Sequence, residues 1–242
     1  MSRVVNSVVA SITLRATMGR KRAFLFAIPP LILVILTLLL KLAKPSLTSW
    51  PAVTLGDFGF SVVLPLTALV VGTSVLGAEV DDGSIIHLLA TPVRRSSVIV
   101  SKFAVAAVIT MMFVAVPELI AGLIATGPSR LAIGLFVGAL AGSVIYNAIF
   151  VMISVLTTRS VAVGLLYVLI WESLLGNFVA GARELSVGQY SLGIANSVAH
   201  NADLHAGLSL TTAATAGGIV TVAALLVATR RLAAFSLKGE AV

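Results

Sequence analysis

The 242-residue sequence contains no cysteine and few charged residues. The absence of cysteine excludes a disulfide framework, an iron–sulfur site and thiol catalysis. Acidic and basic residues together make up 10% of the chain, whereas 59% of it is hydrophobic and the mean hydropathy is +1.12. Soluble domains carry about 25% charged residues. The composition therefore argues against a soluble protein and indicates one integral membrane domain.

A phosphate-binding loop is also lacking. Such a loop requires Gly-Lys followed by Ser or Thr, and no Gly-Lys dipeptide occurs anywhere in the chain. If ATP drives this protein, another polypeptide must therefore bind it.

Apolar runs near 20 residues recur along the chain, and each is long enough for a helix to cross a hydrocarbon layer about 30 Å thick. Their unbroken apolar character favours helices over the alternating strands of a barrel. The sequence therefore predicts an all-α integral membrane fold whose transmembrane domain covers residues 23–229. The six expected spans are Ala23–Leu40, Phe58–Ala78, Val98–Ala125, Leu131–Thr157, Val161–Leu175 and Leu208–Thr229.

The basic residues are distributed unevenly between the two sides of the membrane. Twelve of the sixteen fall on the side that holds both termini, and the other four are Lys41, Lys44, Arg130 and Arg183. Basic flanks stay in the cytoplasm, so both termini, with a tail at 230–242, are expected there. The Ala-, Val- and Gly-rich composition suggests a bacterial cytoplasmic membrane. Because basic flanks account for the net charge of +7, nucleic-acid binding is not expected.

Residues 1–22 precede the first span and have an amphipathic pattern. Apolar residues recur there at helical spacing, at Val4, Val5, Val8, Ile12 and Ala16. The pattern predicts a helix on the inner membrane surface, with basic residues near lipid phosphates. The alternative is a frayed tail. A secretory signal peptide is not indicated, because the apolar run follows a basic segment of 22 residues and lacks a small-x-small cleavage site.

The second predicted span is followed by GAEVDDGSIIHLLATPVRR, residues 77–95. We expect a short helix around Asp81–Ala90, because two aspartates suit its positive N-terminus and Thr91-Pro92 ends it. Its apolar side chains are Ile85, Ile86, Leu88 and Leu89. Exposed on a cytoplasmic face, they need lipid or a protein partner. The alternative is a simple interfacial connector.

This connection resembles the permeases of ATP-binding-cassette exporters of the ABC-2 type. The residues that carry the resemblance are Glu79, Gly83, Ser84, Ile85, Ile86, Leu88, Leu89, Thr91, Pro92, Val93, Arg95 and Lys102. The six spans, the cytoplasmic ends, the surface helix and a long outer segment before the last span extend the resemblance over nearly the whole chain. One departure is that Asp81 and Asp82 are both present, where the family often has one acid just before the glycine.

The resemblance implies a coupling helix at about 79–92 that enters a cleft in a separate ATPase subunit. Its contact residues would be Glu79, Asp81, Asp82, Gly83, Ser84, Ile85, Ile86, His87, Leu88 and Leu89. ATP and Mg²⁺ would bind to that partner, so this chain would hold no cofactor or metal and would be a transporter subunit, not an enzyme. Two copies, as a homodimer, would enclose the path of an exported hydrophobic or amphiphilic substrate, such as a drug, a lipid or a lipid-linked compound.

Four polar side chains within the predicted spans are candidates for the substrate path or gate, because polar groups in hydrocarbon are costly. They are Glu118, Tyr146, Asn147 and Glu172. Glu118 could instead pair with Arg130 or Arg183, or carry a proton. Glu172 could be interfacial, with Trp171 as a belt anchor. The two residues of the fourth span could simply bond across helices.

Glycines recur every four residues in the fourth span, at Gly134, Gly138 and Gly142. This spacing lets membrane helices approach closely, and the partner helix could belong to the same subunit or to a second one. Residues 176–207 are too polar to span, so short re-entrant or surface helices are expected there, and these could form an outer gate. His200 and His205 in this segment lack the spacing of a metal site, which favours a hydrated loop.

Two other function classes fit the sequence less well. A transporter driven by an ion gradient would show inverted repeats and discontinuous helices with charges at mid-membrane. The chain has no internal repeat, and only Glu118 suits proton coupling. A lipid-modifying enzyme would need several convergent metal ligands, and Asp81-Asp82-Gly83 has no second aspartate pair at helical spacing.

Overall fold

The computed structural model of the protein describes residues 11–14, 17, 20–76, 95–175 and 185–238. These residues form helices and connections and contain no strand, which confirms the predicted all-α fold. Five helical stretches are long and apolar enough to cross a membrane, namely Phe24–Ala43, Trp50–Ser74, Arg95–Thr126, Arg130–Leu156 and Leu210–Ala234. The shorter apolar helix Ser160–Glu172 corresponds to the predicted fifth span. The surface helix at 1–22 stays a prediction, because much of that segment lies outside the described residues.

The described helical elements follow one another in chain order. They are α2 (Arg20–Ala43), α3 (Trp50–Val53), η1 (Thr54–Val63), α4 (Leu64–Ser74), α7 (Arg95–Thr110), η2 (Met111–Ala115), α8 (Val116–Thr126), α9 (Arg130–Leu156), α10 (Ser160–Tyr167), η3 (Val168–Leu175), α12 (Val187–Ala199), η5 (Ala202–Leu204) and α13 (Leu210–Lys238). Here η1, η2 and η3 are π-helical and η5 is a 3₁₀ turn.

The second span begins at Trp50, so the predicted start at Phe58 is wrong. Polar residues such as Thr54 and Asp57 resemble a connection in the sequence, yet they lie within the helix. Pro51 stands in the first turn, where a missing N–H leaves no hydrogen bond unmade. The helix can therefore start eight residues earlier than its most apolar part suggests.

Two of the three π-helical segments end two residues before a proline. η1 precedes Pro65 in the first turn of α4, and η2 precedes Pro117 in the first turn of α8. A proline within a continuous helix removes one backbone donor and clashes with the preceding turn. The wider π turn accommodates this disruption, and such turns often occur at functional sites.

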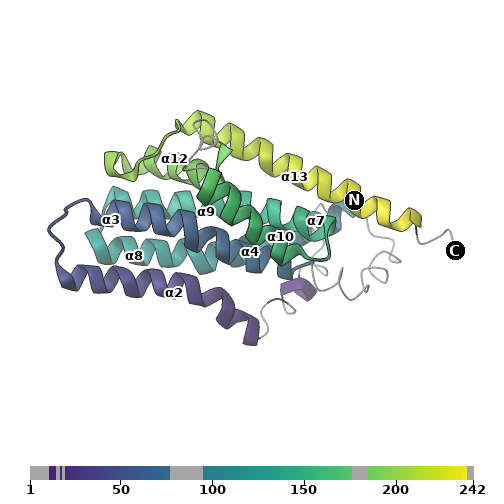
Figure 1. Cartoon of the computed structure of the whole chain (residues 1–242), viewed down its shortest axis with the longest axis horizontal. Helices are drawn as coiled ribbons and strands as arrows, with labels where there is room; N and C mark the ends of the chain where they lie inside the picture. Colours follow the sequence, from purple (N-terminus) through teal and green to yellow (C-terminus); the bar gives the residue numbers. More distant parts are fainter. Residues whose placement is uncertain (1–10, 15–16, 18–19, 77–94, 176–184, 239–242) are drawn as a thin grey trace.

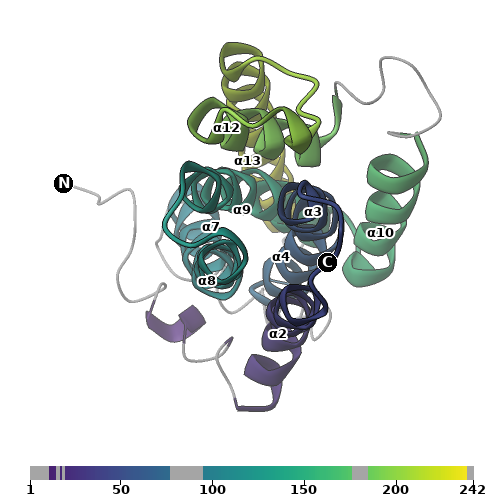
Figure 2. The same ribbon diagram turned by 90° about the vertical axis from the view of Figure 1, so that its left-hand side faces the viewer.

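Helix α9 lies at the centre of the bundle (Figures 1 and 2) and contacts α4, α7, α8, α10, α12 and α13. Its glycines and alanines give it a narrow profile, so that neighbours can surround it. Helices α2 and α13 lie at the periphery, and both expose rows of leucine, isoleucine and valine. An apolar outer surface of this kind is what a helix in contact with lipid tails requires.

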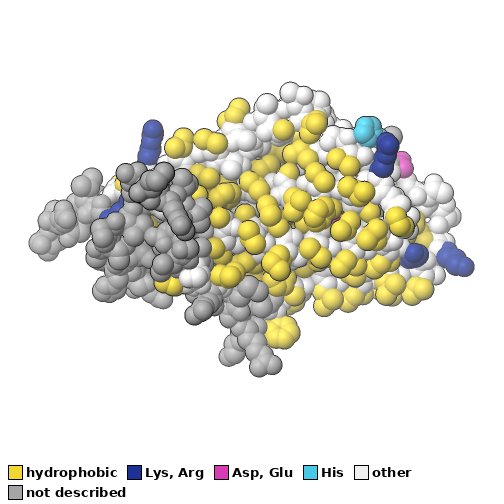
Figure 3. All heavy atoms as spheres, turned by 180° about the vertical axis from the view of Figure 1, so that it is seen from behind, with side chains coloured by type: hydrophobic (Ala, Val, Ile, Leu, Met, Phe, Trp, Pro, Cys, Tyr) yellow, Lys and Arg dark blue, Asp and Glu magenta, His cyan; other side chains and the backbone are white. Residues whose placement is uncertain are grey.

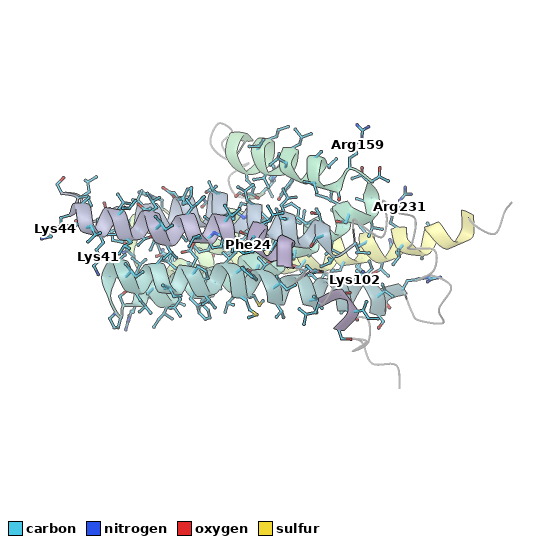
Figure 4. All side chains as sticks on the ribbon, turned by 90° about the horizontal axis from the view of Figure 1, so that it is seen from below. Phe24, Lys41, Lys44, Lys102, Arg159 and Arg231 are labelled. Carbon is cyan, nitrogen blue, oxygen red and sulfur yellow. The ribbon has the colours of Figure 1, made fainter. Side chains whose placement is uncertain are left out.

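Charged side chains lie at the two ends of the bundle. Lys41 and Lys44 are at one end, and Lys102, Arg159 and Arg231 are at the other (Figure 4). We refer to these as the Lys41 end and the Arg159 end. On the face shown in Figure 3, hydrophobic side chains cover the region between the ends. The described bundle thus has the apolar belt and the charged ends of a protein that crosses a membrane.

Candidate functional site

All ten predicted contacts to an ATPase fall within residues 77–94, outside the described residues. They remain a prediction. The described chain stops at Leu76, just after α4, and resumes at Arg95 with α7, and these two helices contact each other. The structure therefore describes the two helices that flank the predicted coupling segment, although it does not describe the segment itself.

Glu118 is fully buried in the first turn of α8. Its carboxyl group lies against Gly59 of η1, where a β-carbon would overlap it. Among the described residues, neither carboxyl oxygen has a hydrogen-bond partner. The alternative of pairing with Arg130 is therefore not seen, and the alternative of pairing with Arg183 lies outside the described residues. Glycine at position 59 thus provides the space that the carboxyl group occupies.

Asn147 and Tyr146 are both fully buried on α9. The Asn147 side-chain amide donates to the Thr110 hydroxyl at 2.9 Å and to the Ser143 carbonyl at 2.7 Å. Thr110 is the last residue of α7 before η2, so this bond joins α9 to the third span where its helix type changes. The Tyr146 ring stacks on Phe150, with 6.0 Å between ring centroids. Among the described residues, the Asn147 carbonyl oxygen has no hydrogen-bond partner.

Glu172 is buried and caps the first turn of α12. Its carboxylate accepts the backbone N–H groups of Val187 at 3.0 Å and Gly188 at 3.3 Å, and the hydroxyl of the N-cap residue Ser186 at 2.5 Å. Tyr167 donates a fourth hydrogen bond at 3.2 Å. A helix N-terminus has unpaired N–H groups and attracts negative charge. Glu172 therefore holds the start of α12 in place, and its depth in the membrane stays a prediction.

A polar cluster surrounds the Glu172 carboxylate. The chain has three tyrosines, and all of them, Tyr146, Tyr167 and Tyr190, lie close enough to Glu172 to interact with it electrostatically. They come from α9, α10 and α12, so the cluster joins three elements. The sequence contains no signal for this arrangement, because its members are spread from position 146 to position 190.

The glycine stripe of α9 contacts α12 of the same chain. A β-carbon at Gly138 would lie 2.6 Å from the Ser191 carbonyl oxygen and 2.7 Å from the Ala195 β-carbon. Gly134 likewise faces Ala195 and Ala199, and Gly142 faces Ser191. The small residues of α12 also recur every four positions, so two small-residue stripes meet. Of the two alternatives left open by the sequence, the structure shows packing within one subunit.

Helix α12 extends into the bundle from the Lys41 end. Its last residue, Ala199, packs on Gly134 near the start of α9, whereas Ser191 packs on Gly142. Gly142 is twelve residues into α9, about 18 Å along the helix at 1.5 Å per residue. The capped N-terminus of α12 therefore lies near the middle of the bundle, in the manner of a re-entrant helix.

The two histidines that follow α12 are exposed, as is Asp203 between them. Among the residues that the structure describes, no group of three His, Cys, Asp or Glu side chains is arranged to hold a metal ion.

Comparison with known proteins identifies the class of this bundle. Residues 18–181, about two thirds of the chain, match the family described as ABC-2 family transporter protein. No curated protein matches the sequence. ABC-2 permeases are non-catalytic membrane subunits without a cofactor, and they associate with ATPase subunits. The apolar helices, the connection between α4 and α7 and this match agree, and the chain therefore belongs to the ABC-2 family of transporter membrane proteins.

Proposed function

We propose that this permease exports a hydrophobic or amphiphilic compound, such as a drug, a lipid or a lipid-linked molecule, across a bacterial cytoplasmic membrane. The observation that carries the proposal is the family match on a chain that lacks a phosphate-binding loop. Energy must then come from a nucleotide-binding partner. The buried side chains of the bundle are mostly hydrophobic, which supports an apolar substrate.

The coupling segment at 79–92 docks on the ATPase in this proposal. Its support is the sequence pattern together with the position of its two ends, since α4 and α7 contact each other. Lys102 donates to Val75 near the first of these ends and lies at the same end of the bundle as Arg159 and Arg231 (Figure 4). By the basic-flank rule, this end faces the cytoplasm, where an ATPase subunit would bind.

A second copy of the chain completes the substrate path, and α12 acts as its gate. The re-entrant position of α12 and the cap that Glu172 places on it, with Tyr167 donating to the same carboxylate, support this role. Glu118 and Asn147 lie beside η2, where the helix has already departed from regular geometry. Together with Tyr146, they are the polar groups that rearrange when the gate opens.

Co-purification with the ATPase subunit tests the docking role. Changing Ile85→Asp together with Leu88→Asp places two charges on the apolar face of the coupling segment, and we expect the ATPase to be lost while membrane insertion is unchanged. Thr158→Asp is the matched control, since Thr158 is exposed on another connection at the same end. Retention of the ATPase by the double variant would contradict the proposal, as would ATP hydrolysis by the purified permease alone.

A further inference from the structure

Lys102 is a charged side chain buried at the Arg159 end of the bundle, with 1% of its surface exposed. Its ammonium group donates to the backbone carbonyl of Val75 at 2.7 Å. Val75 is the C-cap residue of α4, where carbonyl groups have no partner within the helix. A cation at this position also interacts favourably with the negative end of the helix dipole.

Buried apolar side chains of the described chain flank this bond. Val75, Leu76, Val98 and Ile99 belong to one cluster of buried side chains, which we call the loop-base cluster. Its other members are Phe26, Val71, Val105, Ala106, Ile109, Val151, Val155, Ala228 and Leu232. The cluster therefore joins α4 and α7 to α2, α9 and α13. A lysine is costly in such a place unless its charge is well bonded.

The Lys102–Val75 bond joins the two ends of the segment 77–94. Val75 precedes that segment by two residues, and Lys102 lies on α7, two turns after the segment ends. A force applied to a loop moves both flanking helices together only if their ends are fixed to each other. The charge-assisted hydrogen bond from Lys102 to Val75 contributes that connection, and it is strengthened because buried apolar side chains keep the local dielectric low.

We propose that Lys102 is a positioning residue for coupling. It makes α4 and α7 one rigid unit, so that displacement of the segment 77–94 by the ATPase moves both helices and, through the loop-base cluster, α9 and α13. This inference rests on the proposed function, in which that segment docks on the ATPase. Lys102 itself contacts neither the nucleotide nor the substrate.

Distance measurements between two spin labels test the inference without knowledge of the substrate. The chain has no cysteine, so a Ser74→Cys, Ser96→Cys pair labels the ends of α4 and α7 selectively. In the full complex with its ATPase, we expect one narrow distance distribution without nucleotide and with ATP plus vanadate. Lys102→Met should lose the narrow distribution while insertion and ATPase co-purification are unchanged. Lys102→Arg, which keeps a cationic donor, should restore it.

Lys41→Met is the matched control. The Lys41 ammonium also donates to a backbone carbonyl, that of Ile124 near the end of α8, but at the opposite end of the bundle. This variant should keep the narrow distribution. If Lys102→Met does not insert, Lys102→Gln replaces it, because the shorter amide does not reach the carbonyl.

A narrow distribution in the Lys102 variant would overturn the inference, and so would equal broadening in the Lys41 control. These outcomes differ from failure of the proposed function. In that case the wild-type permease would not bind an ATPase at all, whereas the label distances in the permease alone would still report whether Lys102 holds the two helices together.

Discussion

Two buried glutamates in this protein have contrasting surroundings. Glu172 accepts four hydrogen bonds, two of them from the open N-terminus of a helix. Glu118 is fully enclosed, yet neither of its oxygens has a hydrogen-bond partner in the part of the chain that the structure describes. A buried polar group without a partner is costly. Glu172 is therefore stabilising in this arrangement, whereas Glu118 is retained at a cost, which is typical of a residue kept for function.

Gly59→Ala should destabilise the bundle by about 1–3 kcal/mol, the usual cost of an extra group in a packed interior. The new β-carbon would overlap the Glu118 carboxyl group, which is enclosed on every side. Chemical unfolding in detergent would measure the loss. In the Gly59→Ala, Glu118→Ala double variant the clash is gone, so the cost of the alanine at 59 should largely vanish. If alanine at position 59 destabilised the Glu118→Ala background as much as the wild type, Glu118 would not be the reason that position 59 requires glycine.

Glu172→Gln should weaken the cap on α12. The amide nitrogen cannot accept the backbone N–H groups that the carboxylate accepts, and the negative charge at the helix N-terminus is lost. Each lost hydrogen bond to a charged group costs about 1.5–3 kcal/mol. We expect faster amide hydrogen exchange at Val187 and Gly188, with α9 unaffected. If these two amides exchanged at the wild-type rate in the variant, Glu172 would not be the residue that caps α12.

At the scale of elements, close approach of α9 and α12 organises the centre of the bundle. Small residues every four positions on each helix remove side-chain bulk along one line of contact. In a membrane, such contacts replace the hydrophobic effect, because lipid tails are as apolar as leucine. The short α12 can therefore be held at depth without being a full span.

Gly138→Ala should separate α12 from α9, because its β-carbon would lie 2.6 Å from the Ser191 carbonyl oxygen. Backbone atoms cannot turn aside as a side chain can, so we expect a loss of about 1–3 kcal/mol in unfolding free energy. Gly218→Ala on α13 is the control, since no heavy atom lies within 4 Å of its β-carbon position. That change should be neutral or stabilising by up to about 1 kcal/mol, as alanine favours helix. Equal effects would contradict the proposed close contact.

At the scale of the whole molecule, the two charged ends imply an orientation in the membrane. The connection between α2 and α3 lies at the Lys41 end, and the connection between α9 and α10 lies at the Arg159 end. Because the excess of basic residues is at the Arg159 end, the basic-flank rule predicts that this end faces the cytoplasm.

Cysteine labelling in intact cells checks this orientation, since the natural chain has no cysteine to interfere. Ser46→Cys and Thr158→Cys both introduce a thiol at an exposed position, one at each end. We expect a membrane-impermeant maleimide to label position 46 from outside and position 158 only after the membrane is permeabilised. The reverse pattern would invert the topology.

The sequence alone determined the membrane class, the helical character and the family. These properties follow from local features: in hydrocarbon each apolar run must satisfy its own backbone bonds as a helix, and the 77–95 motif is contiguous. Only the tertiary structure decided which groups donate hydrogen bonds to Glu172 and which helix packs against the glycines of α9. It also decided which carbonyl group accepts the hydrogen bond from Lys102. Those answers depend on contacts between residues far apart in the chain, and composition and spacing carry no information about which of several compatible faces will pack together.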